Sequence, residues 1–137
     1  MTLVLPKRMY DEILAHTREG GAEEVCGLIA GQNGRPVRLF RIQNTAENPT
    51  RRYYMEPHAQ LRVLRELEEQ GWELLAIYHS HPASENYPSR TDVAEAFYPE
   101  AYYIISTLSD AAPTPVRAYR IVDGVITEEE VKVEEEG

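Results

Sequence analysis

The sequence contains very little cysteine, since Cys26 is the single one among 137 residues. One cysteine cannot form a disulfide within the chain, which is typical of a cytoplasmic protein. Long hydrophobic runs are also missing, and no segment approaches the roughly 20 apolar residues of a transmembrane helix. The first residues have no basic segment before their short apolar run, which argues against a signal peptide. We therefore expect a cytoplasmic domain without a membrane partner.

Basic residues are too few to balance the acidic ones, and the formal net charge is −9 at pH 7. Such an excess of negative charge disfavours nucleic acids and anionic membranes as partners. Acidic residues are concentrated in residues 128–137, which we expect to form a C-terminal tail, disordered beyond Val133. Basic residues cluster locally, and this cluster is either a solvated surface or a docking patch for an acidic partner. Its members are Arg35, Arg38, Arg41, Arg51 and Arg52.

Helical and strand patterns alternate along the chain. Helices are expected over residues 6–19, from Pro57 to Gly71, and from Ser89 onward. Strands are expected over residues 25–31, 36–42, 72–78 and 101–108, followed by two strands joined at Asp123-Gly124. The order predicts an α/β or α+β domain in which helices cover a sheet.

Two histidines follow the most apolar of these strands, in the segment His79-Ser80-His81-Pro82. Residues two apart on a strand project to the same side, so both imidazoles can point at one position. A His-x-His pair alone is more often two surface residues. Asp92 follows a proline-bounded loop, however, and from the first turn of a helix its carboxylate can return to the strand end. Two imidazoles and one carboxylate are the ligands of a catalytic zinc ion, so we expect one Zn²⁺.

A water molecule activated by zinc also requires a general base. Glu23 and Glu24 directly precede the strand at residues 25–31. A pair of acids in this position usually lies at a solvated strand edge. Glu24 would face the metal if this strand lies beside the strand at residues 72–78.

Three segments together resemble the signature of the JAMM (MPN+) zinc metalloprotease family. They are Glu24-Val25-Cys26-Gly27, His79-Ser80-His81-Pro82 and Ser89-Arg90-Thr91-Asp92. The resemblance covers about residues 5–122 and implies a cytidine-deaminase-like three-layer sandwich, with a mixed β-sheet flanked by helices, as a catalytic domain over residues 1–127. It also implies the following roles: His79, His81 and Asp92 bind zinc, Glu24 is the general base, and Ser89 donates a hydrogen bond to the oxyanion.

The resemblance implies a substrate class as well. The chain has little room for insertions, like the smaller bacterial and archaeal members of the family. We expect a peptidase or isopeptidase that cleaves after the C-terminal Gly-Gly of a ubiquitin-like or sulfur-carrier protein. The leaving group would be a tail, an attached amino acid such as cysteine, or a conjugated protein. The alternatives are a non-catalytic MPN scaffold and a cysteine hydrolase that uses Cys26 with His79, although a buried thiol is normally inert.

Overall fold

Residues 1–135 are described by a computed structural model, in which three helices and seven strands follow one another along the chain. Their bounds are β1 (Thr2–Pro6), α1 (Lys7–Gly20), β2 (Cys26–Gln32), β3 (Arg35–Ile42), α2 (Pro57–Gln70), β4 (Glu73–Ser80), α3 (Arg90–Ala94), β5 (Tyr102–Ser106), β6 (Val116–Val122) and β7 (Val125–Glu134). The longest helices within this part of the chain have 14 residues, and none is long and apolar enough to cross a membrane.

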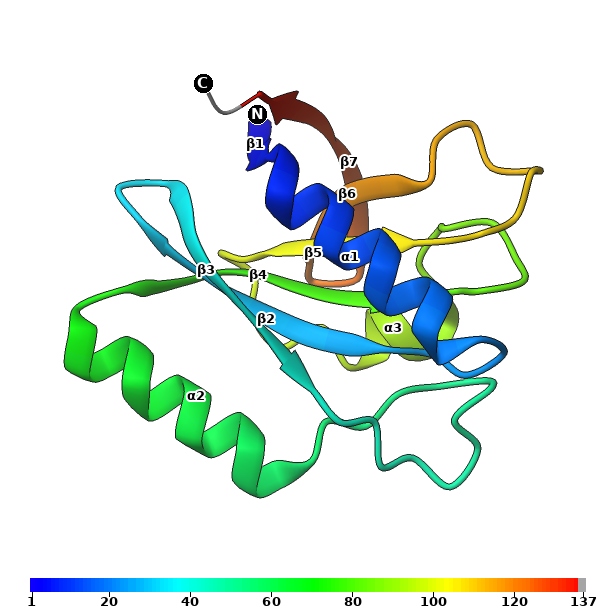
Figure 1. The fold of residues 1–137 in the computed structure, drawn as a ribbon, viewed down its shortest axis with the longest axis horizontal. Helices are drawn as coiled ribbons and strands as arrows, with labels where there is room; N and C mark the ends of the chain where they lie inside the picture. Colours follow the sequence, from blue (N-terminus) through cyan, green and yellow to red (C-terminus); the bar gives the residue numbers. More distant parts are fainter. Residues whose placement is uncertain (136–137) are drawn as a thin grey trace.

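The strands form one mixed sheet in the order β1-β7-β6-β5-β4-β2-β3. The β1–β7 and β4–β5 pairs are parallel, and the other neighbouring strands are antiparallel. Helix α1 lies across one face of this sheet, while α2 lies away from α1 beyond β3 and β4 (Figure 1). The mixed α/β fold with helices flanking a mixed sheet is therefore confirmed.

Alternating side chains of the central strands build one core on each face of the sheet. On β5, Tyr102 and Ile104 pack in the cluster that contains Met9 and Ile13 of α1. The intervening residues of β5 belong to a second cluster, against which Val63 and Leu64 of α2 and Val93 of α3 pack. Successive residues of a strand point to opposite faces, so strands that are apolar throughout require helices on both sides. This explains the continuous apolar runs in the sequence.

Most predicted element ends lie within two residues of the observed ones. Pro57 begins α2, and Gly71 ends it with a φ of 70° in the left-handed region. Asn33 and Asp123 also have positive φ, each followed by a glycine with positive φ, as expected for tight hairpin turns. Among the leucines of α2, which a helical apolar stripe would place together in the core, Leu67 is buried but Leu61 is 47% exposed.

The two ends of the chain differ most from the sequence prediction. Strand β1 was not predicted, and it pairs with β7 between residues 2–6 and 130–134. The acidic tail predicted over residues 128–137 instead continues β7 through Glu134. Pairing with β6 and β1 satisfies the backbone of this segment, and Val131 packs against the core while Glu128 forms an ion pair with Arg117. Residues 136–137 of the predicted tail lie outside the described residues.

Candidate metal centre

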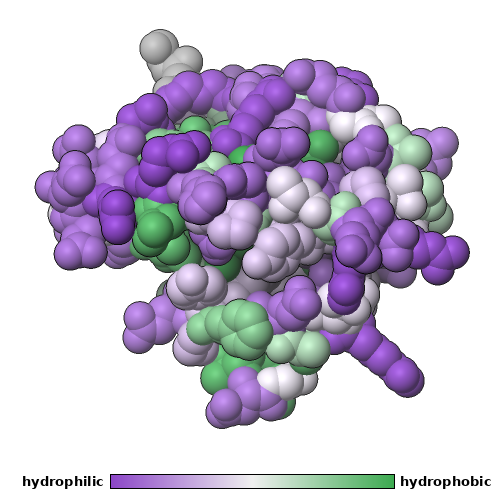
Figure 2. All heavy atoms as spheres, turned by 90° about the horizontal axis from the view of Figure 1, so that it is seen from below, coloured by the Kyte–Doolittle hydropathy of each residue, from purple (hydrophilic) through white to green (hydrophobic). Residues whose placement is uncertain are grey.

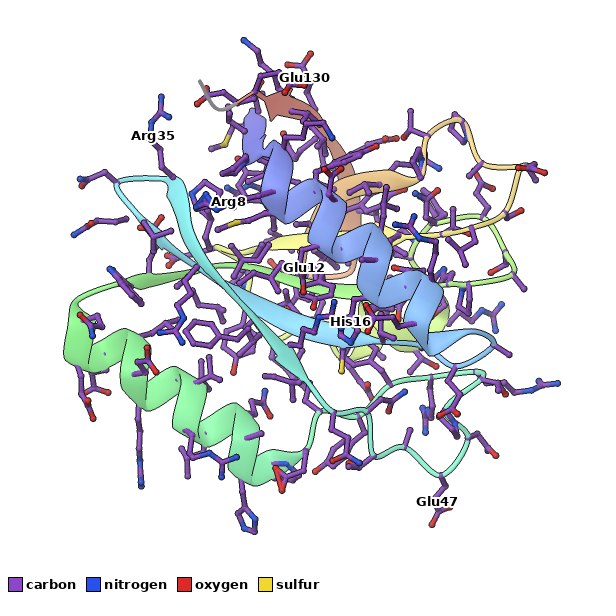
Figure 3. All side chains as sticks on the ribbon, viewed as in Figure 1. Arg8, Glu12, His16, Arg35, Glu47 and Glu130 are labelled. Atoms are coloured by element: carbon purple, nitrogen blue, oxygen red, sulfur yellow. The ribbon has the colours of Figure 1, made fainter. Side chains whose placement is uncertain are left out.

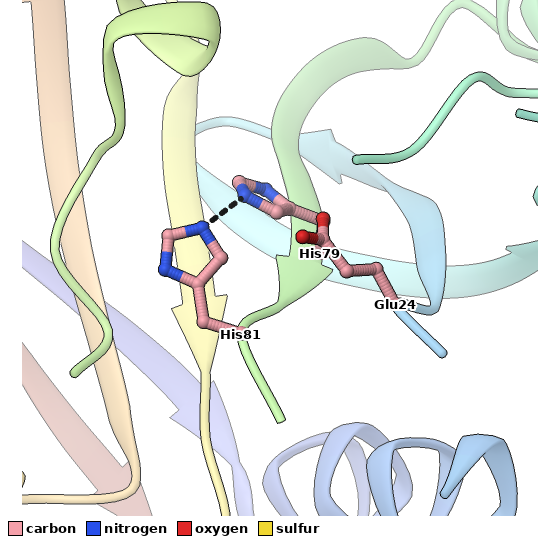
Figure 4. A group of neighbouring side chains, drawn as sticks. All are labelled: Glu24, His79 and His81. Carbon is pink, nitrogen blue, oxygen red and sulfur yellow. Dashed lines mark hydrogen bonds between the residues drawn. The ribbon is translucent and has the colours of Figure 1, made fainter. Parts of the chain in front are cut away.

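The pairing of β2 with β4 brings the predicted base to the predicted metal ligands. The strands are antiparallel, with Cys26 opposite His79. The N–H of Ser80 donates to the carbonyl of Val25 at 3.0 Å, and the N–H of Val25 donates to Ser80 Oγ at 2.9 Å. Glu24 stands two residues before Cys26, and its carboxylate points toward the imidazoles (Figure 4). The adjacency on which the assignment of Glu24 depended is therefore present.

The side chains of His79, His81 and Asp92 meet at a single position. The Nε2 atoms of the two histidines are 3.2 Å apart. One oxygen of Asp92 lies 3.2 Å from Nε2 of His79, and the other lies 3.1 Å from Nε2 of His81. The two histidines are buried, and the Asp92 side chain is 10% exposed. The three predicted ligands thus converge in a mostly enclosed site.

The start of α3 aims the Asp92 carboxylate. Ser89 is the N-cap residue, and its N–H donates to Asp92 Oδ2 at 2.8 Å. In return, the N–H of Asp92 donates to Ser89 Oγ at 3.1 Å. This capping box fixes both residues relative to the helix. Because Ser89 Oγ accepts here, its own proton stays available for another acceptor.

The donor atoms fit a divalent metal ion such as zinc. Nδ1 of His81 lies 3.1 Å from the carbonyl oxygen of Glu85, to which it donates when it carries the proton. The Nε2 lone pair then points toward the other ligands, which is a common arrangement around protein-bound zinc. Imidazole nitrogen and carboxylate oxygen are both normal zinc ligands. Potential ligand atoms of Glu24, His79 and His81 also lie within 4.8 Å of one another, so Glu24 adjoins the same position.

Electrostatics separate the two carboxylates of the site. Burial raises the pKa of Glu24 to about 7, against the opposing positive charges of His81 and Arg52. Burial also acts to raise the pKa of Asp92, but hydrogen bonds to His79 and His81 hold that pKa well below its usual range. A carboxyl group that titrates near neutral pH is suited to proton transfer, whereas a permanently ionised one is suited to hold a cation.

The other residues of the Glu24-Val25-Cys26-Gly27 segment have structural positions. The Cys26 thiol is fully buried, donates to the carbonyl of Ile42 at 3.3 Å, and has its pKa raised to about 12 by burial. It therefore lacks the thiolate character of a nucleophile. A Cβ at Gly27 would lie 2.3 Å from Tyr78 Cε1 and 2.4 Å from the carbonyl oxygen of Phe40. Only glycine allows this close packing of β2 between its neighbours.

Three residues that support the site were not identified from the sequence. The Tyr53 ring stacks on His79 with 4.5 Å between the ring centroids. Nδ2 of Asn44 donates to the backbone carbonyls of Glu24 and Arg52 at 2.9 and 3.1 Å. The third is the fully buried Asn86 in the loop after His81. Their partners are distant in the sequence, so no local pattern indicates these contacts.

Asn86 anchors the loop that connects the predicted ligands. Its Nδ2 donates to the carbonyls of Ile105 and Thr114 at 3.1 and 3.0 Å. Its own backbone carbonyl accepts a hydrogen bond from the Tyr119 hydroxyl at 2.6 Å. Because Asn86 directly follows Glu85, these bonds also hold the carbonyl group that orients His81.

We expect Asn86→Ala to weaken both folding and metal binding. Two carbonyls would lose their donor, which costs about 1–3 kcal/mol when such groups stay buried. Metal affinity should fall by about 10–100-fold, the usual effect of losing support for a ligand. Denaturant unfolding and a competitive zinc titration measure the two effects. The neighbouring Tyr87→Phe variant is the control, and an Asn86→Ala protein equal to it in both measurements would contradict this role.

The sequence and the fold are similar to those of known proteins along most of the chain. Residues 6–122 match a family model described as prokaryotic homologs of the JAB domain. The CysO-cysteine peptidase of Mycobacterium tuberculosis strain H37Rv is 40% identical over 136 residues, which cover 98% of this chain and 92% of that protein. A probable TtuB-protein conjugate cleaving protease of Thermus thermophilus is 34% identical over 124 residues, which cover 90% of this chain and 79% of that protein.

A solved structure also shares the fold along nearly the whole chain. The solution structure of protein DSY2949 from Desulfitobacterium hafniense has a TM-score of 0.82 and 32% sequence identity. The superposed region covers 99% of this chain and 94% of the DSY2949 chain. Together with the matched motif, these comparisons confirm the family resemblance: the chain belongs to the prokaryotic JAB branch of the JAMM (MPN+) family.

Proposed function

We propose that the chain is a zinc peptidase or isopeptidase that hydrolyses the bond after the C-terminal Gly-Gly of a ubiquitin-like or sulfur-carrier protein. The observation that carries the proposal is the convergence of Glu24 with the His79, His81 and Asp92 cluster. The relatives support the substrate class, since one is named for CysO and cysteine and another for cleavage of TtuB conjugates.

We propose that His79, His81 and Asp92 hold one zinc ion per chain, within a cytidine-deaminase-like arrangement of sheet and helices. When bound, zinc supplies Lewis-acid activation of water and of the scissile carbonyl. The capping box at Ser89 and the Glu85 carbonyl keep Asp92 and His81 in place. The family match supports this assignment of the ligands.

Glu24 and Ser89 supply the remaining chemistry. Glu24 takes a proton from the attacking water and transfers it to the leaving amine, a role suited to a buried carboxyl with a pKa of about 7. The Ser89 hydroxyl donates a hydrogen bond to the carbonyl oxygen as negative charge develops there. The bond from the Asp92 N–H to Ser89 Oγ fixes the oxygen while its proton is free to be donated.

A groove of about 290 Å³ beside the centre is the proposed place for the substrate tail. Its walls are mainly aromatic and aliphatic, and they include Tyr53, which stacks on His79. The other lining residues are Leu28, Tyr54, Met55, Gln60, Leu64, Leu74, Ile77, Glu95, Phe97, Tyr98 and Tyr103. A tail that ends in two glycines has no side chains near the scissile bond and fits a narrow groove.

The surrounding surface bears on how a carrier protein would be recognised. Most of the face seen in Figure 2 is hydrophilic, with hydrophobic side chains in small patches between polar ones. Phe97 and Tyr54, at the groove, are 73% and 59% exposed. Exposed aromatic residues within a polar surround are typical anchors for a protein partner. We propose that these two contact the carrier protein.

The proposed function is tested with a small ubiquitin-like protein extended after its Gly-Gly by cysteine or by a second protein. Mass spectrometry should show cleavage directly after the second glycine by the zinc-loaded chain. An excess of chelator should abolish cleavage, and added zinc should restore it. Full activity in excess chelator, or an intact substrate after prolonged incubation with the zinc-loaded protein, would contradict the proposal.

A second prediction concerns the hydroxyl of Ser89. We expect Ser89→Ala to lower kcat by about 100-fold or more, as for other losses of an oxyanion donor. The same change removes the N-cap, at a cost of about 1 kcal/mol in stability. Ser89→Thr keeps both the cap and the donor and should retain most of the activity. An alanine variant with the kcat of the wild type would exclude a role for this hydroxyl.

A further inference from the structure

The loop between β3 and α2 is fixed directly beside the proposed general base. Where the two ends of the loop meet, the N–H of Thr45 donates to the carbonyl of Tyr54 at 2.8 Å. The N–H of Glu24 donates to the carbonyl of Pro49 at 2.7 Å. Nδ2 of Asn44 bonds both the Glu24 carbonyl and the Arg52 carbonyl. The side-chain amide of Asn44 therefore joins the backbone of Glu24 to the backbone of Arg52.

The structure divides the five arginines of the predicted basic cluster into two groups. The first group is paired with carboxylates: Arg35 with Glu134, Arg38 with Glu66, and Arg41 with both Glu12 and Glu19. The second group is Arg51 and Arg52, both exposed, which form no ion pair within residues 1–135. Arg52 directly precedes Tyr53, whose ring stacks on His79, so one of these cations lies close to the metal centre of a protein with a net charge of −9.

Arg52 lines a second groove, next to the aromatic one. This groove of about 260 Å³ is also lined by Tyr53, Tyr54 and Glu95, while Arg51 does not line it. The same three residues line the aromatic groove, and Tyr53 stacks on His79. The two grooves therefore adjoin along these shared residues, and Tyr53 connects both of them to the metal centre. Glu47, at the tip of the loop, also lines the groove of Arg52, and its side chain extends outward from the loop in Figure 3.

We propose that Arg52 binds the α-carboxylate of a leaving group that is a single amino acid, and so favours such a substrate over a conjugated protein. The inference rests on the proposed function. In the reaction, the C–N bond after the second glycine breaks and water oxygen bonds to the carbonyl carbon. One proton from water goes to the leaving nitrogen. An amino acid then carries a carboxylate one carbon from that nitrogen, whereas the lysine side chain of a conjugated protein carries none there.

The chemistry of arginine suits this assignment. A guanidinium group donates two parallel hydrogen bonds to a carboxylate, and it stays charged at every physiological pH. Glu47 and Glu95 share the groove, but neither they nor any other carboxylate of residues 1–135 lies within ion-pair distance of Arg52. Arg52 attracts the Glu24 carboxylate without forming an ion pair with it, so within residues 1–135 its guanidinium group keeps its hydrogen-bond donors for a substrate.

Two substrates that differ in one group test the proposal on the zinc-loaded full chain. One is the carrier protein ending in Gly-Gly-Cys with a free carboxylate, and the other ends in Gly-Gly-cysteinamide. We expect wild type to prefer the carboxylate by about tenfold in kcat/KM, as for a partly exposed hydrogen bond to a charged group. Arg52→Ala should remove this preference, and Arg52→Lys should restore part of it. Arg51→Ala, the matched control, should keep it.

Other outcomes overturn the proposal. These are an unchanged ratio in Arg52→Ala, no preference in wild type, or an equal loss in Arg51→Ala, which would indicate a general charge effect. If neither substrate is cleaved, the proposed function fails. The role of Arg52 is then tested separately, by measuring whether the protein binds short peptides through their carboxylate. Gly-Gly-Ser but not Gly-Gly-serinamide should shift the Arg52 side-chain NMR signal, and equal effects of both peptides would exclude carboxylate binding.

Discussion

Replacing Glu24 by glutamine is expected to lower kcat by about 10²–10⁴-fold, the range for loss of a general acid–base group. Glutamine has nearly the same shape, so the packing around this buried side chain should change little. An amide cannot take a proton from water and deliver it to the leaving amine. The measurement is kcat on the Gly-Gly-Cys fusion, together with the zinc content and the melting temperature of the same sample, both of which should match wild type.

Glu23→Gln is the matched control for this experiment. Glu23 precedes Glu24 in the same segment, but its side chain is exposed. The control should have the activity of the wild type, because its carboxylate is not part of the cluster. The assignment of the base fails if Glu24→Gln turns over normally, or if both variants lose activity to the same extent.

Asp92→Asn is expected to lower zinc affinity by more than about 100-fold and to abolish cleavage at low zinc concentration. The zinc affinity of variants that lack only a group supporting a ligand falls by about 10–100-fold. We expect a larger fall here, because the Asp92 carboxylate itself lies against both histidines at the proposed metal position. An asparagine oxygen can still accept from the Ser89 N–H, so the start of α3 should persist. A competitive titration with a chromophoric chelator measures the affinity, and thermal unfolding with and without zinc measures the linked stabilisation.

Glu95→Gln provides the comparison for Asp92. Glu95 is the C-cap residue of the same short helix and has no hydrogen bond to either histidine. Its zinc affinity should equal that of the wild type. Wild-type affinity in Asp92→Asn would show that the third ligand is a different group, of which the neighbouring Glu24 is the nearest candidate.

Local sequence patterns predicted the parts of the site that depend on short-range geometry. The two-residue period of a strand places His79 and His81 on one side, and the capping pattern at Ser89 places Asp92 in a first helical turn. The position of Glu24 depended on β2 lying beside β4, a pairing between segments about fifty residues apart. The periodicity of either segment contains no information about this pairing, and the family resemblance supplied it.

Contacts between distant segments account for what the sequence did not indicate. Strand β1 and the end of β7 are short or highly charged, and each is stabilised by pairing with the other. Asn44 and Asn86 are ordinary loop residues in the sequence, and they matter because remote carbonyls face their amides. The division of the arginine cluster likewise follows from partners on α1, α2 and β7.

The most direct test is a crystal structure of the protein grown with zinc, with anomalous data collected at the zinc absorption edge. We predict one strong peak per chain, about 2.0–2.2 Å from Nε2 of His79, Nε2 of His81 and an oxygen of Asp92. The Glu24 carboxylate should lie near this peak without coordinating it. A peak coordinated by Glu24 in place of Asp92, or the absence of any peak between the two imidazoles, would contradict the account.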